Sequence, residues 1–135
     1  MTEAVVDASV VLKWFQVEGE SHGQSARLVR ARFERGDLSI VVPRLLHLEV
    51  LNVAGRRWRW QRKALLELVV ALEDLRLDVR DPSPGAVAQW TARGLTAYDA
   101  CYVALAEAEG IPLITDDDRI LGTAPKLAAA LSAIT

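Results

Sequence analysis

The sequence predicts an α/β fold, a three-layer α/β/α sandwich with a mostly parallel central sheet. Short apolar runs, typical of buried parallel strands, alternate with longer segments whose apolar residues recur at helical spacing. This alternation indicates βαβ units with helices on both faces of the sheet. We expect strands at residues 3–7, 38–42, 77–79 and 111–115, and helices at residues 10–15, 21–35, 45–54, 60–75 and 97–109, with another starting at Pro84.

Local signals in the first half of the chain support these elements. The first strand, Glu3–Asp7, is a short apolar run that ends in an acid. Segment 21–35 sets apolar residues among arginines in an amphipathic pattern, and Gly36 follows as a helix stop. Pro43 closes the strand at 38–42.

The second half carries clearer helix boundaries. Ser83 and Pro84 are suited to the N-cap and first helical position, respectively. Thr96 opens the next helix and Gly110 ends it. For residues 125–135 we expect a helix, and the sequence leaves open whether this segment also contains a short edge strand.

Composition indicates an ordinary single globular domain spanning residues 1–135. The chain is 51% hydrophobic and 25% charged, and it has no apolar stretch near the roughly 18 residues of a membrane span. Its N-terminus lacks a basic region, so we expect a cytoplasmic protein. The single cysteine, Cys101, excludes an internal disulfide and a thiolate zinc site. With a net charge of −2, any contact with nucleic acid requires a local basic patch.

Four acids fall where a parallel sheet places ligand-binding groups. Asp7 ends the first strand, and Asp117 follows the fourth. Glu49 and Asp99 lie on helix faces that carry apolar residues one turn away, so both are expected to point inward. Inward carboxylates are uncommon unless they are paired or bound to metal. We therefore expect the four to converge at one rim of the sheet.

Converging carboxylates need a counter-charge, because mutual repulsion and desolvation raise their pKa values. Mg²⁺ and Mn²⁺ prefer oxygen ligands, and Mg²⁺ keeps several waters that a phosphate can replace. Such ions stabilise the attacking and leaving oxygens of an in-line displacement. The chemistry implied is phosphodiester hydrolysis.

Each acid also has a purely structural interpretation. Asp7 is placed to cap the helix that follows it, and Thr96 with Asp99 fits a loose capping box. The run 116–118 fits a solvated turn at a helix N-terminus, and Glu49 fits an ion pair with an arginine. Only the four acids together favour a site.

Three polar neighbours of these acids are supporting candidates. Ser9 is either an ordinary first-turn residue or a donor to the site. Asn52, one turn after Glu49, either orients that acid or bonds to backbone. Thr115 either bonds a ligand or simply ends its strand.

The segment Gly55–Lys63 has the most unusual composition, because five basic residues and two tryptophans stand together. Cations suit phosphates and indoles stack on unpaired bases, which favours RNA contact. Trp and Arg are equally favoured at protein interfaces, and a solvated helix junction is a third interpretation. The residues concerned are Arg56, Arg57, Trp58, Arg59, Trp60, Arg62 and Lys63.

In these motifs the chain resembles the PIN-domain family, and specifically the VapC-type toxins of bacterial and archaeal toxin–antitoxin pairs. Four pieces carry the resemblance, each around one acid and all in the family's order. They are Val5–Val10, Pro43–Asn52, Leu95–Ala106 and Leu113–Asp117.

The resemblance implies a flavodoxin-like sandwich, Mg²⁺ or Mn²⁺ at the acid cluster, and endonucleolytic RNA cleavage by metal-activated water. It assigns the catalytic and metal-binding roles to Asp7, Glu49, Asp99 and Asp117. Supporting roles fall to Ser9, Asn52, Thr115 and Asp116. The three acids at 116–118 leave open which one binds metal, although Asp117 has the best spacing from Thr115.

The resemblance also implies partners: a second copy in a homodimer, a cognate antitoxin, and tRNA or rRNA as substrate. The alternative hypothesis is a catalytically inactive PIN-like binding module that uses protein or RNA contacts. A phosphoryl-transfer receiver or phosphatase is disfavoured, because no suitably placed lysine ends a late strand.

Overall fold

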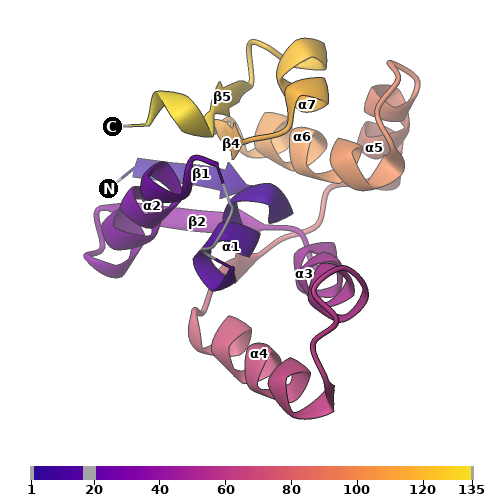
Figure 1. Cartoon of the computed structure of the whole chain (residues 1–135). Helices are drawn as coiled ribbons and strands as arrows, with labels where there is room; N and C mark the ends of the chain where they lie inside the picture. The colour runs from indigo at the N-terminus through magenta and orange to yellow at the C-terminus, as the bar shows by residue number, and fades with distance from the viewer. Residues whose placement is uncertain (1, 17–20, 135) are drawn as a thin grey trace.

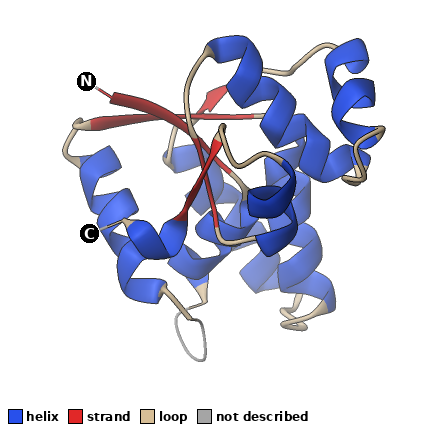
Figure 2. Ribbon diagram, turned by 90° about the horizontal axis from the view of Figure 1, so that it is seen from above, coloured by secondary structure: helices blue, strands red, loops and turns tan. Residues whose placement is uncertain are grey.

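One parallel five-stranded sheet organises the part of the chain that the computed structural model describes, residues 2–16 and 21–134. The strand order is β3-β2-β1-β4-β5, and every neighbouring pair is parallel. Figure 2 shows helices on both sides of the strands. The predicted α/β fold is therefore confirmed. The strands are β1 (Thr2–Val6), β2 (Leu38–Val42), β3 (Asp78–Val79), β4 (Leu113–Thr115) and β5 (Ala128–Ala130).

Helices fill the connections between successive strands (Figure 1). Two helices connect β1 to β2, two connect β2 to β3, and two more lead from β3 back across the sheet to β4. On the return, α6 packs against β1 and β4. The helices are α1 (Ala8–Phe15), α2 (Gly23–Glu34), α3 (Leu45–Arg56), α4 (Arg62–Asp74), α5 (Pro84–Thr91), α6 (Ala97–Glu109) and α7 (Asp118–Thr123).

The helix boundaries of the second half form as expected. The Ser83 side chain accepts a hydrogen bond from the Ala86 N–H, with Pro84 at the first helical position. The Thr96 side chain caps α6, and Gly110 ends that helix in the left-handed conformation, with φ of 67°. The predicted bounds 97–109 are confirmed. They could be predicted because capping residues directly beside the helix decide where it begins and ends.

The prediction for the C-terminal segment is wrong in its main element. Instead of a helix over 125–135, the chain forms the edge strand β5 and then one short 3₁₀ turn, Leu131–Ala133. Residues 128–130 pair with 113–115 of β4, whose backbone groups would otherwise lack partners on that edge. This long-range pairing overrides the helix propensity of the alanines. Thr135 lies outside the described residues.

Several predicted boundaries shift, and one helix was not predicted. Helix α4 begins at Arg62 rather than Trp60, and α2 begins at Gly23 rather than Ser21. The acidic run at 116–118 was interpreted as a turn at a helix N-terminus, and the helix that follows, α7, had no predicted bounds.

The core lies around β1, the central strand, whose residues Ala4, Val5 and Val6 are at most 1% exposed. The chain passes from β1 outwards to β2 and β3, then crosses to β4 on the other side of β1. The carboxyl ends of β1 and β4 therefore form the topological switch point, where open parallel sheets bind ligands. Among the described helices, none combines the length and apolar character needed to cross a bilayer.

A matched pair of leucines on α3 tests this packing. Leu46 is fully buried, so Leu46→Ala should lower the free energy of unfolding by about 2–5 kcal/mol through the cavity it leaves. Leu48 is 69% exposed, so Leu48→Ala should change it by less than about 0.5 kcal/mol. Urea unfolding followed by circular dichroism measures both. Equal losses would contradict the described orientation of α3.

Candidate active site

A pocket of about 210 Å³ opens at the switch point, and all four predicted acids line it. They come from four places in the chain. Asp7 follows β1, Glu49 lies on α3, Asp99 lies in the first turn of α6, and Asp117 follows β4. We call this the acid pocket. Its other polar lining residues are Ser9, Asn52 and Tyr102.

Two hydroxyl groups hold the carboxylate of Asp7. Ser9 Oγ donates to Oδ1 and Thr115 Oγ1 donates to Oδ2, each at 2.5 Å. The strand register explains the second bond, because Val6 pairs with Ile114 and the next residues along are Asp7 and Thr115. Asp7 occupies the N-cap position of α1, but its side chain makes no capping bond. The capping interpretation of Asp7 is therefore wrong.

Burial dominates the electrostatics of Asp7, which is 4% exposed. It raises the pKa of this carboxyl to about 6, against the opposing effect of the hydrogen bonds from Ser9 and Thr115. The nearby charges of Asp117 and Asp99 raise the pKa further. Negative charge at this position is thus costly without a neighbouring cation.

The same two hydroxyls also fix the turn that carries Asp117. Ser9 Oγ accepts a hydrogen bond from the Asp116 N–H, and Thr115 Oγ1 accepts one from the Asp117 N–H, both at 3.0 Å. Each hydroxyl thus bridges the Asp7 carboxylate and the backbone after β4. Ser9 and Thr115 therefore hold Asp7 and the 116–117 turn in one arrangement, which supports the prediction that both are supporting residues.

Glu49 is held by Tyr102, whose hydroxyl donates to Oε1 at 2.5 Å. Burial raises the pKa of Glu49, the Tyr102 bond lowers it, and the charge of Asp99 raises it again. Burial also raises the pKa of Tyr102, so its phenol stays protonated and acts as a donor. The alternative interpretation, an ion pair between Glu49 and an arginine, is not supported, because none of the ion pairs among the described residues includes Glu49. Asn52 lines the pocket too, but no described residue shares a hydrogen bond with its side chain.

The negative charge of Asp117 acts on Asp99 across the pocket. Burial first, and then Asp117, raise the pKa of Asp99, whereas Thr96 and Arg119 lower it. Asp117 also has the structural role foreseen for this turn, because its Oδ1 accepts from the N–H groups of Arg119 and Ile120 and so caps α7. Capping and lining the pocket are compatible, since only one carboxylate oxygen is used.

Geometry distinguishes the three acids at 116–118 by their positions relative to the pocket. Asp116 lies outside the acid pocket and pairs with Lys13 at 3.3 Å and with His22 at 2.9 Å. Asp118 is exposed and begins α7. Only Asp117 lines the pocket. Asp116 reaches the site only through its backbone N–H, which bonds to Ser9, and its supporting role stays a prediction.

The donor set of the pocket fits a hard divalent cation. All its charged lining groups are carboxylates, and none of the ion pairs among described residues includes any of the four acids. Within residues 2–16 and 21–134, however, no three Asp, Glu, His or Cys side chains are grouped closely enough to hold a metal together. Mg²⁺ suits such a spacing, because it binds through one or two carboxylates and keeps several waters.

Tyr102 and Lys13 are the polar residues that sequence reasoning did not place at or beside the site. Tyr102 stands one helical turn after Asp99, so its face of α6 was known, but its bond to Glu49 links residues distant in sequence. Lys13 is the single charged residue of the largely apolar helix α1, and this was the signal that the sequence offered. The structure buries it, with 5% of the residue exposed.

The segment Gly55–Lys63 lies outside the acid pocket, at the junction of α3 and α4. Trp58 and Trp60 are partly buried, with ring centroids 5.3 Å apart and planes tilted by 47°. Their backbone N–H groups bond to the last turns of α3, at the carbonyls of Val53 and Ala54. The junction is thus ordered, with its arginines exposed around two packed indoles.

Fold and site together define an α/β protein with an acid-lined pocket at the switch point of a parallel sheet. The PIN-domain family profile matches residues 4–125, and the chain belongs to this family. No curated protein sequence matches it.

Two solved structures show the same architecture. The crystal structure of PAE2754 from Pyrobaculum aerophilum is 27% identical, with a TM-score of 0.69 over 96% of this chain and 90% of that one. The VapC20 toxin of Mycobacterium tuberculosis, which cleaves the sarcin–ricin loop, is 16% identical, with a TM-score of 0.63 over 84% of this chain and 87% of that one. At this identity the second likeness concerns the fold alone.

The raised pKa of Asp7 predicts a specific pH dependence of stability. A carboxyl with a higher pKa in the folded state stabilises the fold below its unfolded pKa, and this contribution is lost as pH rises through about 6. Without divalent ions, the decrease in unfolding free energy between about pH 3 and pH 8 should be smaller in Asp7→Asn by roughly 3 kcal/mol. Urea unfolding across pH measures it. Asp118→Asn is the control. If wild type and Asp7→Asn show the same dependence of unfolding free energy on pH, the pKa of Asp7 is not raised in the folded protein.

Proposed function

We propose that this chain is a Mg²⁺- or Mn²⁺-dependent endoribonuclease that hydrolyses RNA phosphodiester bonds. One observation carries the proposal: carboxylates from four separate segments line one pocket at the switch point, and no described cation pairs with them. Membership of the PIN-domain family supports a nuclease.

In this proposal Asp7, Glu49, Asp99 and Asp117 hold the cation, directly or through its waters. A bound divalent ion neutralises charge on the phosphate and lowers the pKa of water. The protein's contribution is positional, because Ser9 and Thr115 orient Asp7 and Tyr102 orients Glu49. Burial raises the pKa of Glu49 and of Asp99, and a bound divalent ion would offset the cost of their negative charges.

We further propose that the protein is the toxin of a toxin–antitoxin pair, a homodimer that inhibits translation by cutting tRNA or rRNA. The VapC20 toxin has the same fold, and this shared fold is the reason for the proposal. A short antitoxin-like reading frame immediately upstream of the gene would support it independently.

A catalytically inactive binding module is the second candidate. The absence, among described residues, of three closely grouped metal-ligand side chains favours it. The two candidates differ in whether RNA is cut and in whether a divalent ion stabilises the fold.

Substitution of the pocket acids tests the nuclease directly. Asp7→Asn and Asp99→Asn should each abolish Mg²⁺-dependent cleavage of total cellular RNA while leaving the circular dichroism spectrum unchanged, because each removes a charge that holds the cation. Asp118→Asn, an exposed acid next to the pocket, should cleave like wild type. Cleavage that survives in both pocket variants would rule out the proposed site.

Metal binding has its own readout in thermal unfolding. At about 100 times its Kd, Mg²⁺ should stabilise the wild-type protein by about 2.7 kcal/mol and raise Tm by several degrees. The shift should disappear in Asp99→Asn and persist in Asp118→Asn. Differential scanning calorimetry at constant ionic strength measures it, and a wild-type Tm insensitive to Mg²⁺ and Mn²⁺ would favour the binding module.

A further inference from the structure

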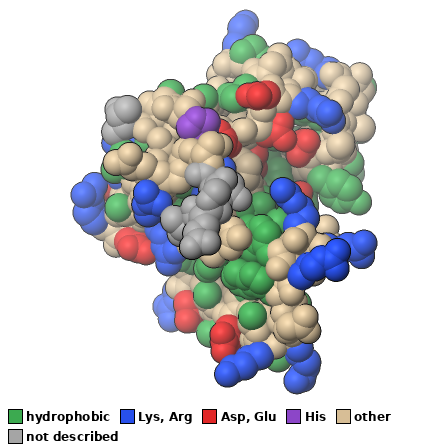
Figure 3. All heavy atoms as spheres, viewed as in Figure 1, with side chains coloured by type: hydrophobic (Ala, Val, Ile, Leu, Met, Phe, Trp, Pro, Cys, Tyr) green, Lys and Arg blue, Asp and Glu red, His purple; other side chains and the backbone are tan. Residues whose placement is uncertain are grey.

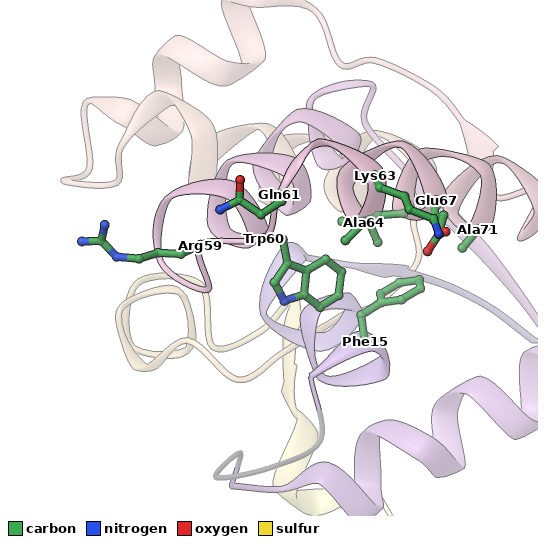
Figure 4. A pocket seen from close by; sticks show the side chains of 9 residues that line it. Phe15, Arg59, Trp60, Gln61, Lys63, Ala64, Glu67 and Ala71 are labelled. Carbon is green, nitrogen blue, oxygen red and sulfur yellow. The ribbon is translucent and has the colours of Figure 1, made fainter.

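A second pocket, of about 730 Å³, lies between the end of α1 and the start of α4. We call it the Trp60 slot. Figure 4 shows the indole of Trp60 and the ring of Phe15 pointing into the same hollow, with Arg59 and Gln61 beyond the indole and Lys63 and Glu67 along α4. Both rings are partly exposed. The slot therefore offers aromatic faces to a ligand, with polar side chains at its rim.

Helix α1 borders both the slot and the acid pocket. Leu12 lines the acid pocket, and Phe15, three residues later on α1, lines the slot. Three residues of an α-helix advance only about 4.5 Å. Figure 3 shows acidic side chains near α1 and α6 and, below them on the same face, an apolar area flanked by Lys and Arg side chains. A single extended ligand can reach both.

Charge distinguishes the two pockets. Arg59 and Lys63 line the slot and are exposed, and Arg56, Arg57 and Arg62 belong to the same junction. Glu67 is the one acid among the described lining residues of the slot. In a chain of net charge −2, this concentration of cations forms the local basic patch that binding of a polyanion requires.

We propose that the Trp60 slot binds an unpaired nucleobase of the RNA substrate, stacked on the indole, while Arg59 and Lys63 contact the neighbouring phosphates. This rests on the proposed ribonuclease function and adds to it a base-binding subsite on this chain, outside the acid pocket. Stacking on aromatic side chains combined with a cationic groove is the usual way proteins bind unpaired nucleic acid.

Two observations favour a base over an apolar segment of a partner protein. The Trp60 indole N–H has no hydrogen-bond partner among the described residues, so it is free to bond a base or sugar oxygen. The aromatic surface is also bordered by cations, which matches a nucleotide with its phosphate, whereas an apolar helix would gain nothing from them.

Paired substitutions at Trp60 separate stacking from packing. In the cleavage-deficient Asp99→Asn protein, Trp60→Leu should weaken binding of a fluorescein-labelled single-stranded RNA oligonucleotide roughly 5- to 150-fold, because it removes the π face and keeps apolar bulk. Trp60→Phe should stay within about threefold of the Trp60 protein. For fully duplex RNA, Trp60→Leu should change affinity little. Fluorescence anisotropy measures Kd, and circular dichroism checks that each variant is folded.

Two arginines give a matched control for the phosphate contact. Arg59 and Arg76 are both exposed and both have left-handed backbone, with φ of 58° and 53°, but only Arg59 lines the slot. Arg59→Ala should weaken RNA binding and reduce the slope of log Kd against log salt by about one, whereas Arg76→Ala should leave the slope unchanged.

The outcomes separate this proposal from the proposed function. Binding that depends on Trp60 in a wild-type protein that never cuts RNA would support the slot and reject the nuclease. Cleavage lost with the acids, but RNA affinity unchanged by Trp60→Leu and Arg59→Ala, would overturn the slot and leave the nuclease standing. Loss of a protein partner with unchanged RNA affinity would also overturn it, in favour of a protein interface.

Discussion

The buried carboxylate of Asp7 is the constraint on which the site depends. It directly follows the central strand, where there is almost no water to solvate its charge, and its two oxygens accept hydrogen bonds from hydroxyls of α1 and β4. Those hydroxyls also bind the backbone that places Asp117. The hydrogen bonds around this one carboxylate therefore connect the end of β1 to α1, to β4 and to the turn that follows β4. Burial that is unfavourable for an isolated acid becomes useful where a cation offsets it.

Acidic and basic side chains occupy two separate regions that helix α1 borders. Acids gather at the switch point, and cations surround two indoles at the α3–α4 junction. Helix α1 borders both regions, with Leu12 in the acid pocket and Phe15 in the Trp60 slot. In the proposed function, the basic region holds the polyanion while one phosphate lies at the acids. The buried Lys13, also on α1, pairs with Asp116, which lies outside the acid pocket.

Local signals explain where sequence reasoning succeeded. The strand 38–42 and the helix 97–109 have the predicted bounds, because Pro43, Thr96 and Gly110 decide them within a few residues. The prediction of a helix for the C-terminal segment was wrong, because β5 forms only by pairing with the distant strand β4. The four acids were foreseen from strand ends and helix faces, but the bond between Tyr102 and Glu49 was not, because it joins residues on α6 and α3 that no local pattern relates.

The sequence by itself determined the alternation of strands and helices, the parallel sheet, and which acids follow strands or lie on inward helix faces, since these follow from short-range periodicity and capping. The tertiary structure alone decided which of the acids at 116–118 faces the pocket, because Lys13 and His22 capture Asp116. It also decided that the indole of Trp60 faces Phe15 in a slot beside the acids. Both outcomes depend on contacts between distant segments, which local sequence patterns do not encode.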